Sequence, residues 1–563
     1  MDVLSLDEAI SLFVKMANEN PIPLVKGFLA CNIDLEMKSL GSMSNVGEAF
    51  ISWRIEDDLA LISYMNEICS KYNIDYQDIK CHEFSWSSCG LNVKSRFCFA
   101  DKSEEQIRSR MGFLKALNSA FVSEVIPLVD FNSMQGLSRT ISRNKNIFFS
   151  TWKMKYLDSI LEETALKHDG QPSEIITLNP IGSLSQENDS LSSTWFYSSI
   201  QILSNVNSSN FCTRLPQSDD PQFPLNIKMI GEEVQGNSGS FRQFLNRITE
   251  ELQGTILSLL MPYMGNGPFK GLYQLLPAPN TILTEKLLIH LGQILGIAVR
   301  SGIPMSLGMM PHFWMILSGD IIPDSYLSTY DPELHRYFEE LESIPDEETF
   351  ATFVQHHPEQ LFIYQSLEGE DYELIPDGKN ILLDFGNKDK FLRLSKEFRR
   401  KELECSEKMN CIIAGIATVL PIGLIRGIFT WEELQLKICG TDDIDINILK
   451  KFTMYQVGIS DDDRHIQDFW TVVSSLTSKQ LKRFIKFACN QERIPKPKDE
   501  NHVPPPFPMK IAPSDDRDGD QDKLLIRAET CIFMIKIPRY SSIEVMQEKL
   551  IYSIQSADDP LSG

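Results

Sequence analysis

Hydrophobic residues recur at helical spacing in the first 170 residues of the chain. Within residues 104–129, apolar side chains follow one another every three or four positions, at Ile107, Met111, Leu114, Leu117, Phe121 and Val125. The stretch 150–167 repeats this pattern between Trp152 and Leu161. Because residues three and four apart share one face of a helix, both stretches predict amphipathic helices. We therefore expect residues 1 to about 170 to be mostly helical.

Two later stretches have the pattern of strands, and a polar segment separates them. "SEIITLNPIG" at 173–182 is rich in β-branched residues and ends at proline and glycine, and "FPLNIKMIG" at 223–231 alternates. Both predict strands. Residues 183–222 between them are rich in Ser and Asn, which indicates a surface loop with one short helix. A helix is then expected over 239–254, ending at glycine.

The stretch 283–302 is a long apolar helix that carries Gly292 and Gly296 on one face. This spacing is also found where two helices dimerise inside a membrane. Here the stretch contains Glu285, Lys286, His290 and Arg300. These ionisable residues favour the other interpretation, in which the glycines allow close helix packing inside a protein core.

Two helices near the C-terminal end have complete start signals. Thr430 precedes Glu433 by three residues, and Thr477 precedes Gln480 by three, which is the spacing of a capping box. The Gly-containing polar stretch 455–463 between them could be a hinge or a boundary. After a Pro-rich acidic connection, 490–522, we expect a strand from Ile532 to Ile537 and a helix with one apolar face. This C-terminal part is therefore α+β.

Composition narrows the possible functions. The 563 residues include 77 acidic and 54 basic ones, for a net charge of −23. Such a surface disfavours nucleic acid and anionic membranes as partners, since both need a basic face. The N-terminus lacks the positive charge of a signal peptide, and the apolar run 411–425 is short and broken by Pro421. We expect a cytoplasmic protein without membrane insertion.

The cysteines and histidines do not form a recognisable metal site. The 11 cysteines are odd in number and scattered, which is typical of reduced thiols, and no C-x-x-C pair occurs. The possible ligand groups are Cys81, His82, Cys89 and Cys98, the pair His356–His357, and the acidic stretch 514–522. The cysteine spacing is too loose for zinc, the histidines lack a partner at i+4, and the acidic stretch has Leu525 where a calcium loop needs Glu. We expect neither metal nor cofactor.

One cysteine stands at the border of two kinds of sequence. Cys531 follows the polar stretch 520–530 and precedes the apolar stretch from Ile532 to Ile537. We expect a loop that becomes a strand at this residue, which would support an exposed nucleophile on a rigid element. An ordinary thiol at the end of a strand fits the pattern equally well.

The sequence around this cysteine resembles the end of HECT-type ubiquitin ligases. The shared features are Thr530-Cys531, Ile537-Pro538, the Tyr540-Ser541-Ser542 turn and the helix that follows. Upstream, "FTWEEL", "KICG" and "LGQILGIAVRSGIP" also resemble that family, in the same order along the chain. The similarity covers about residues 220–563. Residues 101–182 resemble the helical lead-in of its large HERC-like members.

The resemblance implies an α+β bilobal HECT domain preceded by a mainly helical region. It implies a lead-in at 101–182, a larger lobe at 223–454, a hinge at 455–459 containing Gly458, and a catalytic lobe at 460–563. The loop segment at 183–222 is expected from its composition, and the resemblance does not cover the helical region at 1–100, whose role is unknown. Residues 320–380 would dock a ubiquitin-conjugating enzyme. Cys531 would accept ubiquitin from it as a thioester and pass it to a lysine of a protein substrate.

Three departures from the family pattern bear on activity. Glu529 stands where the family often has His, Ile532 replaces Phe, and Pro560 stands where many members have Phe. An acid next to a thiolate raises the thiol pKa, and Arg527 is the candidate to offset it, beside Thr530 as a supporting residue. The alternative function is therefore a catalytically silent relative that binds ubiquitin or the conjugating enzyme as a scaffold. A cysteine protease would need a His and Asn/Asp arrangement that is not evident.

Overall fold

The structure is a computed structural model. It describes residues 55–72, 74–86, 101–124, 126–133, 137–165, 174–178, 191–204, 206–207, 211–212, 225–229, 237–265, 268–356, 360–441, 444–489, 493, 508–515, 519–530 and 533–556. Several residues considered above lie outside these ranges, namely Cys89, Cys98, Val125, His357, Cys531, Ile532 and Pro560.

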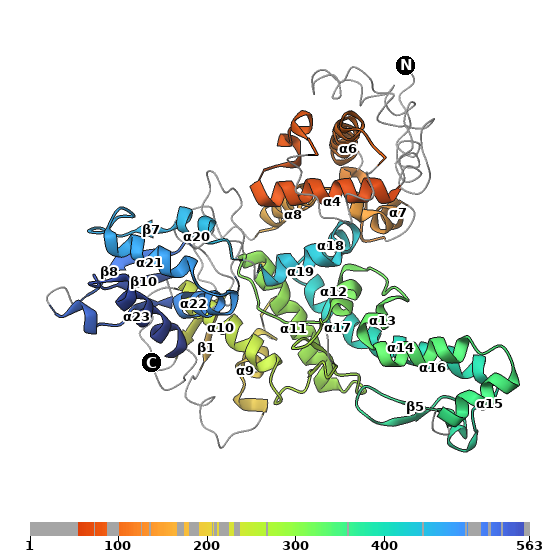
Figure 1. The fold of residues 1–563 in the computed structure, drawn as a ribbon. Coiled ribbons are helices and arrows are strands. Elements are labelled where there is room, and N and C mark those ends of the chain that lie inside the picture. Colours follow the sequence, from red (N-terminus) through yellow and green to blue (C-terminus); the bar gives the residue numbers. More distant parts are fainter. Residues whose placement is uncertain are drawn as a thin grey trace.

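Four helices form the N-terminal part of the described chain: α4 (Ile55–Tyr72), α6 (Glu104–Glu124), α7 (Leu137–Arg143) and α8 (Ser150–Glu163). The two amphipathic helices expected from the sequence are α6 and α8. These N-terminal helices pack together at the top of Figure 1, above α18 and α19. Their buried residues belong to the same hydrophobic core as the larger unit below, from Leu61 to Cys439.

The larger unit contains the parallel pair β1–β2, the antiparallel pair β3–β4, and seven α-helices among the described residues. These elements are β1 (Glu174–Leu178), α9 (Trp195–Leu203), β2 (Leu225–Met229), α10 (Asn237–Leu252), β3 (Leu260–Pro262), β4 (Tyr273–Leu275), α11 (Ile282–Ser301), α12 (Pro311–Ser318), α17 (Ser406–Ala417), α18 (Ile422–Ile428) and α19 (Trp431–Cys439). The expected strands at 173–182 and 223–231 are β1 and β2. The capping box of Thr430 and Glu433 is present at the start of α19.

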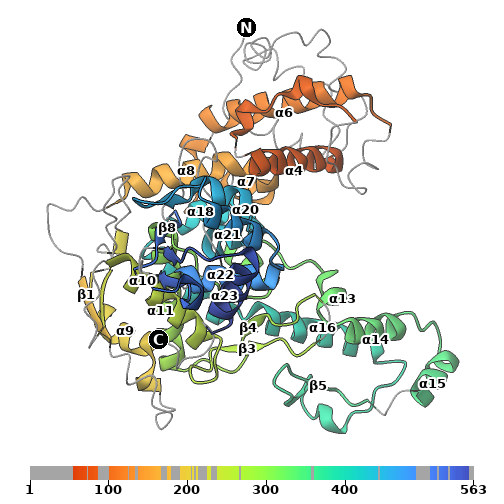
Figure 2. The same cartoon turned by 60° about the vertical axis from the view of Figure 1, so that its left-hand side comes forward.

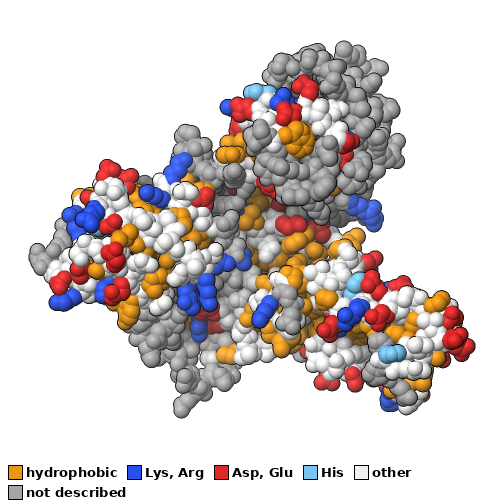
Figure 3. Space-filling model, viewed as in Figure 1, with side chains coloured by type: hydrophobic (Ala, Val, Ile, Leu, Met, Phe, Trp, Pro, Cys, Tyr) orange, Lys and Arg blue, Asp and Glu red, His pale blue; other side chains and the backbone are white. Residues whose placement is uncertain are grey.

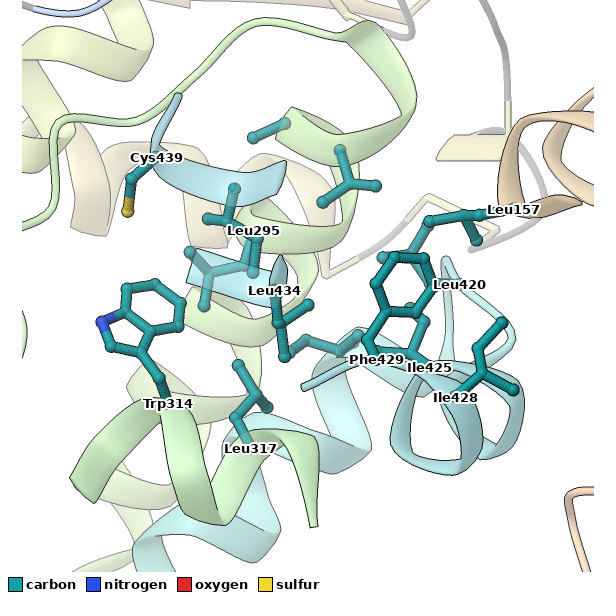
Figure 4. Packing of buried hydrophobic residues seen from close by; sticks show 14 of the residues in the cluster. Leu157, Leu295, Trp314, Leu317, Leu420, Ile425, Ile428, Phe429, Leu434 and Cys439 are labelled. Carbon is teal, nitrogen blue, oxygen red and sulfur yellow. The ribbon is translucent and has the colours of Figure 1, made fainter. Parts of the chain in front are cut away.

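The N-terminal helices are attached to this unit by buried contacts. Figure 4 shows Leu157 of α8 beside Leu420, Ile425 and Phe429 of the larger unit. Polar contacts add to the packing: Lys153 Nζ donates to Glu433 Oε2 at 2.8 Å. Lys145 Nζ lies 2.8 Å from Asp320 Oδ1. The N-terminal helices and the larger unit are therefore one structural body.

Helices α11 and α17 cross with their backbones in contact. A Cβ added to Gly292 would lie 2.0 Å from Ile412 O, and one added to Gly415 would lie 1.9 Å from Ile289 O. The expected close packing at Gly292 is confirmed, with Gly415 as its partner on α17. By length and composition α11 could also cross a bilayer, but 61% of its apolar window is buried inside the fold, as in a core helix.

A separate subdomain, here called the arm, extends from the larger unit at the lower right of Figures 1 and 2. It comprises α13 (Tyr326–Tyr330), α14 (Pro332–Glu342), α15 (Glu347–His356), β5 (Ile363–Gln365), β6 (Asp371–Glu373) and α16 (Lys388–Glu404). The arm has its own small core around Phe338, Phe362 and Phe391. It therefore holds its shape without sharing the main core.

The C-terminal unit combines a four-stranded sheet with four helices. Its elements are α20 (Ile446–Phe452), β7 (Met454–Tyr455), α21 (Arg464–Ser474), α22 (Ser478–Cys489), β8 (Lys510–Pro513), β9 (Arg527–Glu529), β10 (Met534–Ile537) and α23 (Ile543–Ser556). The strand order is β7-β8-β10-β9, with only β9 antiparallel to its neighbour. The fold as a whole is α+β, as expected.

The boundary between the two units differs from the expected hinge at 455–459. Strand β7 pairs with β8, and Ile444 and Leu449 belong to the C-terminal core. The core of the larger unit ends at Cys439. Residues 455–459 thus lie inside the C-terminal unit, and the two hydrophobic cores meet between Cys439 and Ile444 in the sequence. A two-residue strand and a short helix give weak local signals, so the sequence suggested the nearby glycine turn.

Candidate active site

The chain around Cys531 is framed by an antiparallel pair of strands. Strand β9 ends at Glu529, β10 begins at Met534, and these two residues are paired in the register. The prediction of a polar loop before the cysteine is therefore wrong for Arg527–Glu529, because these residues form a strand. Strand β10 is central in the sheet, since β8 pairs with its other edge. Cys531 itself, between β9 and β10 in sequence, lies outside the described residues.

Phe533 fixes the start of β10 in an unusual backbone conformation. Its φ is 50°, in the left-handed region, and its side chain is 4% exposed. This region costs a non-glycine residue ~1–2 kcal/mol, so burial of the ring and backbone bonds must hold it. Lys510 N donates to Phe533 O at 2.8 Å, and Phe533 N donates to Thr530 O at 3.4 Å. The residues on both sides of the cysteine in sequence are thus joined to each other.

Glu529 has a lysine as its partner. Lys536 Nζ lies 2.6 Å from Glu529 Oε1 and 2.8 Å from Asp515 Oδ1. The register places Lys536 opposite Arg527, so the contact with Glu529 is a diagonal cross-strand pair. The hydrogen bonds that Lys536 donates, first to Asp515 and then to Glu529, raise the pKa of Lys536 above its usual range.

Lys536 therefore provides the positive charge beside Glu529 that was expected from Arg527. Arg527 is exposed. The acid that replaces the family's histidine is therefore part of a charge-paired group with Lys536 and Asp515.

Sequence reasoning missed an arginine that reaches this site from the larger unit. Arg242 on α10 is 2% exposed, and its Nη2 donates to Thr530 O at 3.1 Å. The available signal was a cation within the apolar face of a helix, since Phe241 and Leu245 beside it are buried. Its acceptor is 288 residues away in sequence, so no local pattern could identify the contact.

Gly458, the expected hinge residue, lies in the turn after β7. Its φ of 98° is in the region that favours glycine. Its carbonyl oxygen accepts a hydrogen bond from Arg539 Nη2 at 3.3 Å, within the same unit. Gly458 therefore shapes a turn of the C-terminal unit and stands apart from the boundary between the units.

Five of the described thiols outside this site are poor nucleophiles. Burial raises the pKa of Cys69 and of Cys439 to about 12, and that of Cys405 to about 11. Burial also raises the pKa values of Cys81 and Cys411. The reactive form is the thiolate, so these five cysteines stay protonated and unreactive near neutral pH.

Some of the residues considered above as metal ligands belong to the described part of the chain. Among the described residues, no group of three or more His, Cys, Asp or Glu side chains is arranged to hold a metal ion. Cys81 and His82 are described and belong to a short 3₁₀ helix, whereas Cys89, Cys98 and His357 are outside the described ranges. His356 ends α15 and lies on the exposed surface of the arm.

The arm carries a concentration of negative charge. Residues 332–373 contain twelve acidic residues against a single basic one, Arg336, and so hold about half of the chain's net charge of −23. Figure 3 shows acidic side chains over the arm at the lower right. The expected docking region, 320–380, corresponds to most of the arm and its connection to α12.

The fold and the site together define a two-lobed protein whose smaller lobe contains two paired strands, with a cysteine between them in the sequence. A family model described as HECT-domain (ubiquitin-transferase) matches residues 261–559, which is more than half of the chain. The chain therefore belongs to the HECT-domain family. The larger and C-terminal units correspond to the two lobes of the bilobal domain expected from the sequence.

Individual relatives agree with this assignment. The chain is 33% identical, over its whole length, to human "Probable E3 ubiquitin-protein ligase HECTD4". It is 30% identical to human "E3 ubiquitin-protein ligase HERC2" over 58% of the chain, and 26% identical to mouse "E3 ubiquitin-protein ligase HACE1" over 69%. The chain spans only 15%, 7% and 40% of the length of these three relatives.

Proposed function

We propose that this chain is a ubiquitin-protein ligase that carries ubiquitin on Cys531. The observation that carries the proposal is the paired strands β9 and β10 on either side of Cys531, within the stretch that matches the HECT-domain family. The raised pKa values of five described thiols elsewhere support the choice of this cysteine. The partners would be ubiquitin, a ubiquitin-conjugating enzyme and protein substrates.

The reaction has two balanced steps. In the first, the Cys531 thiolate attacks the carbonyl carbon of the ubiquitin thioester on the conjugating enzyme, a new C–S bond forms, and the enzyme's thiolate leaves. In the second, a neutral lysine amine attacks the Cys531 thioester, the C–N bond forms, the C–S bond breaks, and the amine loses a proton to solvent. Thioester exchange is nearly balanced in energy and the product stays reactive toward amines, so neither step needs a cofactor.

The two units would move relative to each other between these steps. We propose that the conjugating enzyme docks on the arm within 320–380 and that the hinge lies at 440–443, where the hydrophobic core changes. Gly440 at this boundary has a φ of 69°, a conformation that glycine adopts without strain. A few residues that absorb a backbone rotation are sufficient for such a motion.

We also propose a cytoplasmic location. Seven described cysteines are free thiols, which suits a reducing compartment. Cell fractionation of the full chain tests this, and recovery in a secreted or lumenal fraction would contradict it.

A single-turnover assay tests the proposed activity. Conjugating enzyme preloaded with ubiquitin is mixed with the chain, and products are separated on a non-reducing gel. We expect a thiol-sensitive ubiquitin adduct on the wild type, none on Cys531→Ala, and a thiol-resistant adduct on Cys531→Ser. Cys411→Ala is the matched control, because Cys411 is a partly exposed thiol in α17 and should leave the adduct unchanged. No adduct with any of a panel of conjugating enzymes would overturn the proposal and favour the scaffold function.

A further inference from the structure

A buried cation connects the two units at the proposed catalytic loop. Arg242 of α10 belongs to the larger unit, and the Thr530 carbonyl that accepts its hydrogen bond belongs to the C-terminal unit. Thr530 directly precedes Cys531 in the chain. The larger unit therefore holds the C-terminal unit at the residue next to the proposed nucleophile.

This contact matters energetically because the guanidinium is almost fully out of water. Taking a charged group from water is costly unless hydrogen bonds replace its hydration. Hydrogen bonds from a charged donor are also stronger than neutral ones. Removing the Thr530 carbonyl from Arg242 would therefore leave the buried cation without one of its acceptors. The bond favours the docked arrangement of the two units.

The two described residues of the connection between β9 and β10, Thr530 and Phe533, are also held by other contacts. The same Thr530 oxygen accepts from Phe533 N, and Phe533 is fixed by its buried ring and by Lys510 N. A restraint on Thr530 thus also acts on Phe533 and, through it, on β8 at Lys510. Arg242 consequently sets the position of the connection relative to α10.

A second contact between the units is weaker. Lys486 Nζ of α22 lies 4.0 Å from Glu250 Oε1 of α10, and both side chains are partly exposed. Exposed ion pairs of this kind contribute ~0–1 kcal/mol. Figures 1 and 2 both show α22 beside α10. Helix α10 therefore forms part of the docking surface for the C-terminal unit, and of these two contacts that of Arg242 is the more buried.

The C-terminal unit, which carries Thr530, lies away from the arm. Both views place the C-terminal unit on one side of the larger unit and the arm on another. A conjugating enzyme bound to the arm would have to meet the cysteine away from α10. The Arg242–Thr530 bond must then break for the first step and can form for the second.

We propose that Arg242 is a positioning residue for the second step, in which it holds the β9–β10 connection on α10 while lysine attacks the thioester. This inference rests on the proposed function. In that step the C–N bond forms, the C–S bond breaks and sulfur leaves as a thiolate, so negative charge develops at the cysteine. A fixed cation beside the preceding residue stabilises that charge.

The kinetic test separates the two steps in the full chain. Arg242→Gln should discharge a preformed thioester to free lysine roughly tenfold more slowly than the wild type, the effect of losing one charged hydrogen bond. Thioester formation should be unchanged or faster, and Arg242→Lys, which keeps the charge, should recover part of the discharge rate. The control is Arg247→Gln, since Arg247 pairs with Glu250 and Glu251 on its own helix. Unchanged discharge, or equal slowing of both steps, overturns the proposal.

A second measurement uses the protein alone. Hydrogen exchange of peptides that cover β9 and β10 should be about three- to tenfold faster in Arg242→Gln than in the wild type and in Arg247→Gln, because the units undock more often. Exchange in α11 serves as a folding control and should not change. Equal exchange in all three proteins overturns the docking contact. Since no ubiquitin is present, this result is independent of whether Cys531 forms a thioester.

Discussion

The crossing of α11 and α17 allows a sharp prediction for Gly415→Ala. The added methyl carbon would lie 1.9 Å from Ile289 O and 2.9 Å from Ile289 C. A normal contact between carbon and oxygen is about 3.3 Å, so the helices must move apart by more than ~1 Å. The nearest atoms belong to the backbone, and no rotamer change can remove the clash.

The cost follows from the packing around this point. Leu288, Leu291, Ile412 and Ile416 on the two helices are buried. A gap of ~0.5–1 Å forfeits a quarter to a half of the dispersion energy at such contacts. Overpacking a core lowers the stability of a protein by ~1–3 kcal/mol. Replacing glycine by alanine inside a helix otherwise raises stability by ~0.5–1 kcal/mol. Because the clash is with the backbone, we expect Gly415→Ala to lower the free energy of unfolding by ~2 kcal/mol in total.

Native-state hydrogen exchange of α11 measures this loss. A destabilisation of ~2 kcal/mol should accelerate exchange of the α11 amides by roughly thirtyfold, since ~1.4 kcal/mol is a factor of ten. The matched control is Asn410→Ala, an exposed position on the same helix α17, which should change exchange less than about twofold. If Gly415→Ala exchanged at the same rate as Asn410→Ala, the argument from backbone contact would be refuted.

Two further predictions concern titratable groups. Lys536→Met should lower the melting temperature of the C-terminal unit at pH 8, because Lys536 pairs with Glu529 and Asp515. Its pKa is raised on folding, so this stabilisation is present below the usual value of 10.5 and should fade as the pH rises beyond it; a constant difference up to pH 12 would contradict this. Burial lowers the pKa of His290 to about 4, so stability should fall as the pH drops from 6.5 toward 4. His290→Asn should flatten this part of a melting-temperature profile against pH, and an unchanged slope would refute the assignment.

Local signals predicted the regular elements well. The capping boxes at Thr430 and Thr477 are formed, with Glu433 and Gln480 as their partners. The apolar face expected on the last helix is buried at Met546, Leu550 and Ile554. These features depend on residues three or four apart, so the sequence contains them in full.

Non-local contacts were harder to predict. The pairing of β7 with β8 joins residues more than 50 positions apart, and without it the turn at Gly458 resembles a hinge. Strand β9 has three residues, too few for an alternating pattern to emerge, so Arg527–Glu529 was expected to be a loop. For the same reason the sequence did not indicate Lys536 as the partner of Glu529, because only the diagonal of an antiparallel pair brings these two side chains together.

The common core of the N-terminal helices and the larger unit has a consequence for natural variation in this chain. The segment that matches the family begins at 261, yet buried side chains such as Leu61 and Leu157 complete the same core. A substitution there would raise the fraction of unfolded molecules, and cells degrade unfolded molecules. Each molecule that stays folded would keep its normal properties. Variants in α4 or α8 would therefore be recognised by low protein abundance, and an assay of purified protein alone would overlook them.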